Sequence, residues 1–191
     1  MLHSLGINTD FLTVSTEPTG HAIIQVNQDG ENAIITHGGA NHTITQSEID
    51  FALEGTKETD FVLIQNEIKN VSYIIERAKK KGLQVAFNAA PINKGVEDYP
   101  LDVLDLLFLN EIEAEQLSGT TGTAEMIRTL SKKFPATKLI ITLGGNGSIY
   151  HYKKETLEQI AIDAGRIVDT TGAGDAFVGT FLAYFVETGR P

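Results

Sequence analysis

The chain has 191 residues with 25 acidic and 15 basic side chains, which gives a formal net charge of −10 at neutral pH. Its length fits one domain, and a hydrophobic content of 41% is enough to bury a core, so a disordered chain is excluded. Nucleic-acid binders usually present a basic face, so the acidic balance argues against a nucleic-acid partner. The absence of cysteine excludes disulfides, thiolate metal sites and cysteine nucleophiles.

No apolar run approaches the roughly 18 residues of a membrane-spanning helix. The first ten residues (MLHSLGINTD) also lack the basic and then apolar layout of a secretory signal. We therefore expect a cytoplasmic protein that does not bind a membrane.

Near the N-terminus, two runs rich in β-branched residues flank a short polar segment. The runs are 22–26 (AIIQV) and 33–36 (AIIT), and Asp29-Gly30 lies between them. An Asp-Gly pair tolerates the positive φ values of a tight hairpin turn. The pattern predicts a β-hairpin.

From residue 45 onward, short apolar runs alternate with amphipathic ones. Thr45 and Glu48 have the spacing of a capping box, which predicts a helix that runs to about residue 53. Further helices are expected at 71–81, from 110, at 124–134 and at 174–186, and strands at 61–64, 83–87, 103–109, 138–142, 148–152 and 157–162. Strands that are apolar throughout and alternate with helices predict an α/β fold, with a doubly wound, mostly parallel sheet and helices on both faces.

In such sheets, ligands bind at the carboxyl ends of the strands. The clearest candidate for a ligand-binding motif is residues 169–175 (DTTGAGD), where the last predicted helix begins. Gly172 and Gly174 remove side chains where the chain enters the helix, so unpaired N–H groups and the helix dipole form an anion site. Asp175 lies at the mouth of this turn, where a carboxylate can take a proton from an attacking hydroxyl. Taken alone, the same residues fit a helix-start acid after a tight turn equally well.

Two further strand ends carry candidate residues. Asn110 and Glu113 suit a nucleotide phosphate and a magnesium-bound water, but by themselves they are better explained as a cap at a helix start. Residues 142–147 (TLGGNG) form a glycine-rich turn that lets a flat ligand approach the backbone. A plain β-turn explains this turn equally well.

Together, the residue types and the order of these three patterns resemble the ribokinase-like carbohydrate kinases, the PfkB family. The family's C-terminal signature matches residues 169–175 and continues to Gly179, while Thr180 departs from the small residue usual at that place. Within the family the chain is most similar to the ribokinases, whose motif order is followed by residues 19–22 (TGHA), 30–32 (GEN), 39–41 (GAN), 88–91 (NAAP), 110–113 (NEIE) and 142–144 (TLG). The resemblance spans essentially the whole chain.

The resemblance implies ATP-dependent phosphorylation of a sugar, in the first instance of D-ribose to D-ribose 5-phosphate. Asp175 is then expected to bind the sugar and to deprotonate its hydroxyl. The anion hole for the transferred phosphoryl group is expected to consist of Gly172, Ala173 and Gly174. Glu113 is expected to act on Mg²⁺, and Asn110 on the nucleotide phosphates.

The resemblance also assigns the other ligands. Asp169 and Thr171 are expected to contribute to a monovalent-cation site, which takes K⁺ in ribokinases. Glu67 corresponds to an acid that binds the sugar, and residues 19–36 to a lid over it, through which complete enzymes associate as homodimers. The ATP site is expected to be lined by Gly174 and by Thr142, Leu143, Gly144, Gly145, Asn146 and Gly147.

Two alternatives remain open within this resemblance. One is another sugar or nucleoside kinase of the same family, such as a fructokinase or an adenosine kinase. The other is a nucleotide-binding fragment without turnover.

Proteins of this family extend beyond this chain at both ends. Their N-terminal sugar-binding aspartate and their Gly-Gly-Lys-Gly-x-Asn segment have no counterpart here. We therefore expect one partial domain, with the lid at 19–36 and the α/β core at 45–191. One sheet edge and some apolar surface should then be uncovered, so that the chain alone has little activity and tends to associate.

Overall fold

The computed structural model describes residues 2–26, 32–92, 95–163, 165 and 170–191. Within these residues, six strands form one sheet in the order β3-β4-β5-β6-β7-β8. They are β3 (Phe61–Gln65), β4 (Gln84–Asn88), β5 (Leu106–Asn110), β6 (Lys138–Thr142), β7 (Ser148–Tyr152) and β8 (Glu155–Gln159). Strands β3 to β6 run parallel, and β7 and β8 are antiparallel to their neighbours. The predicted α/β fold with a mostly parallel sheet is confirmed.

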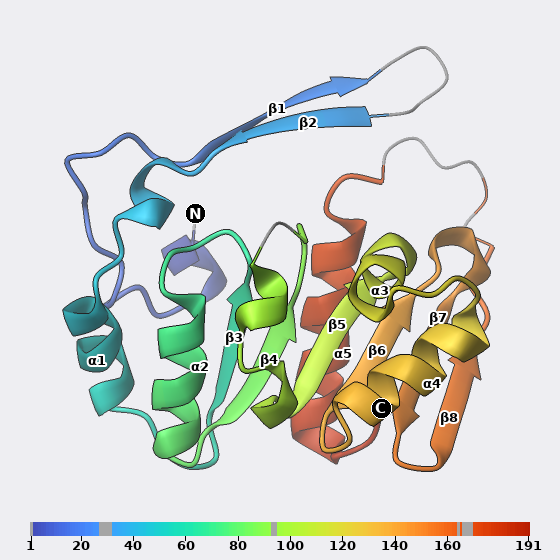
Figure 1. Cartoon of the computed structure of the whole chain (residues 1–191). Helices are drawn as coiled ribbons and strands as arrows, with labels where there is room; N and C mark the ends of the chain where they lie inside the picture. Colours follow the sequence, from blue (N-terminus) through green and yellow to red (C-terminus); the bar gives the residue numbers. More distant parts are fainter. Residues whose placement is uncertain (1, 27–31, 93–94, 164, 166–169) are drawn as a thin grey trace.

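Helices cover both faces of this sheet (Figure 1). One face carries α1 (Gln46–Glu54), α2 (Val71–Lys80), α3 (Glu111–Ser118) and α4 (Thr123–Lys133), and the other carries α5 (Ala173–Thr188). Leu107 and Leu109 of β5 belong to the core under α1 to α4, whereas Phe108 packs on Phe181 of α5 with ring centres 5.4 Å apart. Because such strands are buried on both sides, their sequences are apolar throughout rather than alternating.

The predicted capping box at the start of α1 is present. The Glu48 N–H donates to Thr45 Oγ1 (3.3 Å), and the Thr45 N–H donates to Glu48 Oε2 (2.8 Å). The described residues also form short 3₁₀ turns, which are η1 (Leu2–Leu5), η2 (Gly39–His42), η3 (Val96–Asp98), η4 (Leu101–Val103) and η5 (Gly144–Asn146).

Two strands differ from their predicted bounds. Strand β5 begins at Leu106 rather than at 103, because Pro100 starts the turn η4 and accepts a hydrogen bond from the Val103 N–H (3.4 Å). Strand β8 begins and ends earlier than predicted, and Ile160 and Ile162 lie exposed beyond it. The apolar runs therefore predicted that these strands exist but not where they begin and end.

The N-terminal hairpin forms a separate sheet. Its strands β1 (His21–Val26) and β2 (Asn32–His37) are antiparallel, and His21 pairs with His37 at its base. Figure 1 shows the hairpin extending above the carboxyl ends of the parallel strands, the place expected of a lid. The turn predicted at Asp29-Gly30 lies outside the described residues.

Strand β3 is an edge of the six-stranded sheet in the described part of the chain. Leu63 on this strand is 46% exposed, an unusual value for a leucine within a sheet that is covered on both faces. Among the described helices, none combines the length and the apolar character needed to span a lipid bilayer.

Candidate active site

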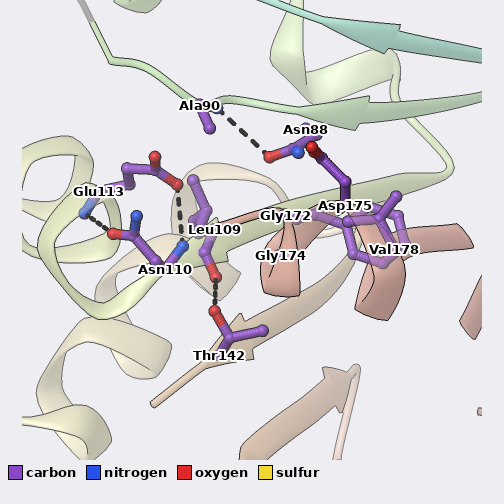
Figure 2. Close-up of a pocket in the computed structure, with 11 residues that line it drawn as sticks. Asn88, Ala90, Leu109, Asn110, Glu113, Thr142, Gly172, Gly174, Asp175 and Val178 are labelled. Carbon is purple, nitrogen blue, oxygen red and sulfur yellow. Dashed lines mark hydrogen bonds between the residues drawn. The ribbon is translucent and has the colours of Figure 1, made fainter. Parts of the chain in front are cut away.

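A cavity of about 210 Å³ opens at the carboxyl ends of β4, β5 and β6, where α5 begins (Figure 2). Figure 2 shows Asp175 on one side of the cavity and Asn110 and Glu113 on the other. The predicted residues that line it are Asn110, Glu113, Thr142, Gly172, Gly174 and Asp175. Asn88, Ala90, Phe108, Leu109 and Val178 complete the wall. The fold thus brings the three predicted motifs to one place.

The wall on the α5 side is a helix N-terminus without a side-chain cap. Gly172 adopts a left-handed conformation (φ 76°), which favours glycine, and the helix begins at Ala173. The Ala173 N–H donates to Thr170 O (3.1 Å), so Ala173 contributes less to an anion hole than predicted. An anion in this cavity would meet the first turn of the helix from Gly174 onward and the positive end of the helix dipole.

Asp175 lies in the first turn of α5, where its exposed side chain lines the cavity. Its Oδ1 accepts a hydrogen bond from Gln65 Nε2 at 2.9 Å. Since Gln65 ends the edge strand β3, this bond joins the sheet to a helix that lies 110 residues further along the chain. A carboxylate has two acceptor oxygens, so Oδ2 is left to accept the proton of a bound hydroxyl.

Asn110 and Glu113 cap α3 reciprocally. The Glu113 N–H donates to Asn110 Oδ1 (2.8 Å), and the Asn110 N–H donates to Glu113 Oε2 (2.9 Å). The explanation as a helix cap is therefore correct, and both side chains line the cavity as well. Glu113 is only 6% exposed, and burial raises the pKa of its carboxyl, an effect that the Asn110 N–H partly opposes.

The carboxylates around this cavity are groups of the kind that bind Mg²⁺. Within the described residues, no group of three or more His, Asp or Glu side chains is arranged to hold a metal ion. Glu113 and Asp175 nevertheless line one cavity, and Mg²⁺ is typically held by one or two carboxylates together with phosphate oxygens and water. Burial of the Glu113 carboxylate also makes a nearby cation favourable.

The predicted monovalent-cation site is only partly described. Asp169 lies outside the described residues, and Thr171 is exposed just before α5. The assignment of K⁺ to these residues therefore stays a prediction.

A second cavity, of about 520 Å³, adjoins the first and shares Thr142 and Gly174 with it. Its walls also include Gly144, Gly147, Ser148, Gln159, Ile160, Ala161, Ile162, Ala173 and Phe177. Ile160, Ile162 and Phe177 make this space apolar, which suits the flat base of a nucleotide. Gly147 has φ 104°, and a Cβ there would lie 1.9 Å from Gln159 O, so this turn requires glycine.

The glycine-rich turn does not line this cavity along its whole length. Leu143 instead packs against the core and lines a separate hollow with Ile127 and Ile149. Gly145 and Asn146 lie in η5 and do not line either of the two cavities described above.

A third cavity, of about 270 Å³, lies at the base of the hairpin. Glu67 lines it together with the neighbouring Asn66, and its role as the sugar-binding acid stays a prediction. The hairpin side contributes Gly20, His21, Ala22, Thr36, His37, Gly38, Asn41 and His42, and Pro91 completes the wall. Glu67 thus lies between the hairpin and the sheet.

Sequence reasoning assigned no role to Asn66 and Asn88, which line the cavities, or to Gln65, whose amide donates a hydrogen bond to Asp175. Asn88 ends β4 and lines the first cavity, and Gln65 ends β3 beside it, since the two residues pair in the sheet register. A polar residue at the carboxyl end of an otherwise apolar parallel strand is the signal that could have found them.

The chain matches the model of the pfkB family of carbohydrate kinases over residues 1–191. It is 34% identical over 191 residues to a ribokinase of Arabidopsis thaliana, an alignment that covers 95% of this chain and 50% of the relative. It is 32% identical over 197 residues to a deoxyribokinase of Salmonella typhi, covering 98% of this chain and 63% of the relative. The chain therefore spans about half to two thirds of the length of these relatives.

Solved structures of ribokinases are also similar to this chain. A ribokinase of Giardia lamblia is similar with a TM-score of 0.82 at 31% identity, over 97% of this chain and 62% of that one. The Arabidopsis thaliana ribokinase complexed with ribose and ATP is similar with a TM-score of 0.79 at 28% identity, and the match covers 96% of this chain and 62% of that one. The family resemblance stated from the motifs is confirmed: the chain belongs to the pfkB family of carbohydrate kinases.

Proposed function

We propose that this chain carries the phosphoryl-transfer site of an ATP-dependent sugar kinase whose acceptor is D-ribose. The observation that carries the proposal is the position of Asp175 at the N-terminus of α5, in a cavity that shares Gly174 with the apolar cavity suited to a nucleotide base. Ribokinases among the relatives, one of them complexed with ribose and ATP, support ribose as the acceptor.

In the proposed reaction, the Asp175 carboxylate accepts the proton of a sugar hydroxyl as the hydroxyl oxygen attacks the γ-phosphorus of ATP. The bond from that phosphorus to the bridging oxygen breaks, and ADP leaves with its electron pair. The α5 N-terminus from Gly174 onward lies against the same cavity and stabilises the negative charge of the transferred group. Catalysis of this kind consists mainly of positioning and charge stabilisation.

The nucleotide is proposed to lie across the first two cavities. Its base would occupy the apolar space beside Ile160 and Phe177, and its phosphates would pass Thr142 toward Asn110. Glu113 would hold Mg²⁺, which when bound neutralises charge on the phosphates. The sugar would reach Asp175 from the cavity lined by Glu67, beneath the hairpin.

Three further parts of the proposal follow from the family. A monovalent cation such as K⁺ would bind near Asp169 and Thr171, and the working protein would be cytoplasmic. A second copy would associate through the hairpin, where Ile23, Ile24 and Ile35 are exposed at 54%, 42% and 61%. Exposed apolar side chains on one small sheet support such an association.

The test is a kinase assay with D-ribose, ATP and Mg²⁺ on this chain extended at both ends to the length of its relatives, and on the Asp175→Asn variant of that extended protein. Ribose 5-phosphate should form, and the variant should lower kcat by at least about 100-fold, the scale of general-base catalysis. An unchanged rate in the variant would end the assignment of Asp175 as the base. ATP binding measured by calorimetry without any product would instead favour a nucleotide-binding fragment.

A panel of acceptors tests the choice of sugar. Because one relative is a deoxyribokinase and other family members act on fructose or nucleosides, the panel contains 2-deoxyribose, fructose and adenosine beside ribose. The highest kcat/KM should belong to ribose. A higher kcat/KM for any other acceptor would replace ribose in the proposal.

A further inference from the structure

A hydrogen bond from Gln65 joins the edge strand β3 to Asp175, the proposed base. It is half-buried at the end of β3, and its Nε2 lies 2.9 Å from Asp175 Oδ1. An ionised carboxylate can only accept hydrogen bonds, so the amide nitrogen and not the amide oxygen must face it. The contact therefore fixes the orientation of both side chains.

The next residue holds this strand end in place. Asn66 is 6% exposed, and its Nδ2 donates to Pro91 O (2.7 Å) while its Oδ1 accepts from the Tyr99 hydroxyl (3.1 Å). The Tyr99 ring in turn packs edge-on against Phe87, with ring centres 6.1 Å apart. One end of the Asn66 amide is thus bound to Pro91 O and the other to Tyr99, whose ring packs on the buried Phe87, and these bonds restrain the backbone next to Gln65.

The same strand end also reaches the cavity on the sugar side. Asn66 and Glu67 line that cavity, and Gln65 binds the carboxylate in the neighbouring one. Three consecutive residues therefore connect the predicted sugar-binding acid with the predicted base. A shift of this segment would displace both groups together.

We infer that Gln65 is a positioning residue for Asp175: its amide holds Oδ1, so that Oδ2 is presented to the sugar hydroxyl, and residues 65–67 keep the base in register with the sugar cavity. The inference rests on the proposed function. Asp175 is exposed and without this contact its carboxylate is free to change rotamer. Misplacement of a reacting group by about 1 Å can cost a factor of about 100 in rate.

Kinetics of Gln65 variants test the role. Gln65→Leu keeps the size of the side chain but removes the donor, and Gln65→Glu keeps the shape but places a second carboxylate against Asp175. Both should lower kcat by about 10- to 100-fold, while the KM for ATP stays within about twofold, because Gln65 lines neither nucleotide-side cavity. The matched control is Gln84→Leu, a half-buried glutamine at the opposite end of the neighbouring strand β4. A wild-type kcat in Gln65→Leu, or a fall in kcat shared with Gln84→Leu, would overturn the inference.

A spectroscopic readout separates the contact from the activity. In ¹H–¹⁵N spectra of the chain, the side-chain amide signal of Gln65, identified by its loss in Gln65→Leu, should move in Asp175→Asn and stay in place in Glu67→Gln. A signal that stays in place in Asp175→Asn overturns the inference even if the chain is an active kinase. A signal that moves, together with no phosphoryl transfer by the protein extended to the length of its relatives, overturns the proposed function, and with it the positioning role of Gln65, but establishes the contact.

Discussion

Asn110 and Glu113 serve as a helix cap and as a cavity wall at the same time. Each side chain accepts the backbone N–H of the other, at 2.8 and 2.9 Å, and both line the cavity that contains Asp175. A structural role and a functional role are therefore not alternatives for this pair. Variants that keep the cap but change the charge can separate the two.

Glu113→Gln and Glu113→Ala should differ in stability. The glutamine amide oxygen can still accept a hydrogen bond from the Asn110 N–H. The free energy of unfolding of Glu113→Gln at neutral pH should therefore be at least as large as that of the original chain. Alanine leaves that N–H without its partner, which should lower the free energy of unfolding by about 1 to 2 kcal/mol. Urea unfolding followed by circular dichroism measures both.

If Glu113 acts on Mg²⁺, both variants should raise the Mg²⁺ concentration needed for half-maximal kinase activity, whatever their stability. Glu111→Gln, an exposed acid in the first turn of the same helix, is the control and should leave it unchanged. A normal Mg²⁺ requirement in Glu113→Gln would restrict Glu113 to the cap.

The raised pKa of Glu113 also predicts how stability depends on pH. Burial raises this pKa above its ordinary value of 4.5, so the folded chain holds the proton more tightly than the unfolded chain. As pH rises from 4.5 through the raised pKa, the wild-type chain should lose stability at this site, because the buried group must become charged. The advantage of Glu113→Gln in free energy of unfolding should therefore grow over this window and vanish below it. An advantage that is constant across pH would contradict the assignment.

Local patterns predicted most of the fold and the composition of the first cavity. The capping box at Thr45, the alternation of apolar strands with helices and the glycines before α5 each involve neighbours in sequence, and each is present in the structure. Because parallel strands end at one edge of a sheet, motifs at the ends of β5 and β6 had to meet the start of α5 there.

The features that the sequence did not reveal depend on the direction of side chains, on the conformation of a turn and on contacts between residues far apart in the chain. Residues 142–147 were predicted as one wall, but Leu143 follows Ile141 at the two-residue period of a strand and packs in the same core. The bond between Gln65 and Asp175 depends on how α5 lies against the edge strand, and no local pattern encodes that. The bond from the Ala173 N–H to Thr170 O spans only three residues, but it depends on the backbone conformation of the turn before α5, which the residue types alone did not specify.

The folded chain should lose stability in acid because of His151. Its Nδ1 lies 2.8 Å from Thr156 Oγ1, and its Nε2 is buried without a hydrogen-bond partner among the described residues. Burial lowers the pKa of this imidazole below its ordinary value of 6.5, so the unfolded chain takes up the proton first. Stability from this site should therefore be complete above pH 6.5 and fall as pH drops from 6.5 through the lowered pKa.

The measurement is urea unfolding of the chain and of His151→Phe between pH 5 and pH 8. The variant should show a flatter dependence on pH below 6.5, while His3→Gln, at an exposed histidine, should follow the original chain. Equal slopes for all three proteins would mean that His151 is free to take up a proton in the folded state.

Gly147→Ala should damage the nucleotide-side cavity, and Gly145→Ala should not. At Gly147, φ is 104° and an added Cβ would lie 1.9 Å from Gln159 O and 2.8 Å from the Ala161 N, which are backbone atoms that cannot rotate away. The end of β8 must then move, which should cost about 1 to 3 kcal/mol and shift Ile160 and Ile162 in the cavity wall. At Gly145 nothing lies within 4 Å of the added atom. Calorimetry with ATP should therefore find binding weakened by about 5- to 100-fold in Gly147→Ala alone, since 1.4 kcal/mol corresponds to a factor of ten. Equal weakening in both variants would mean that the whole turn, rather than its contact with β8, shapes the site.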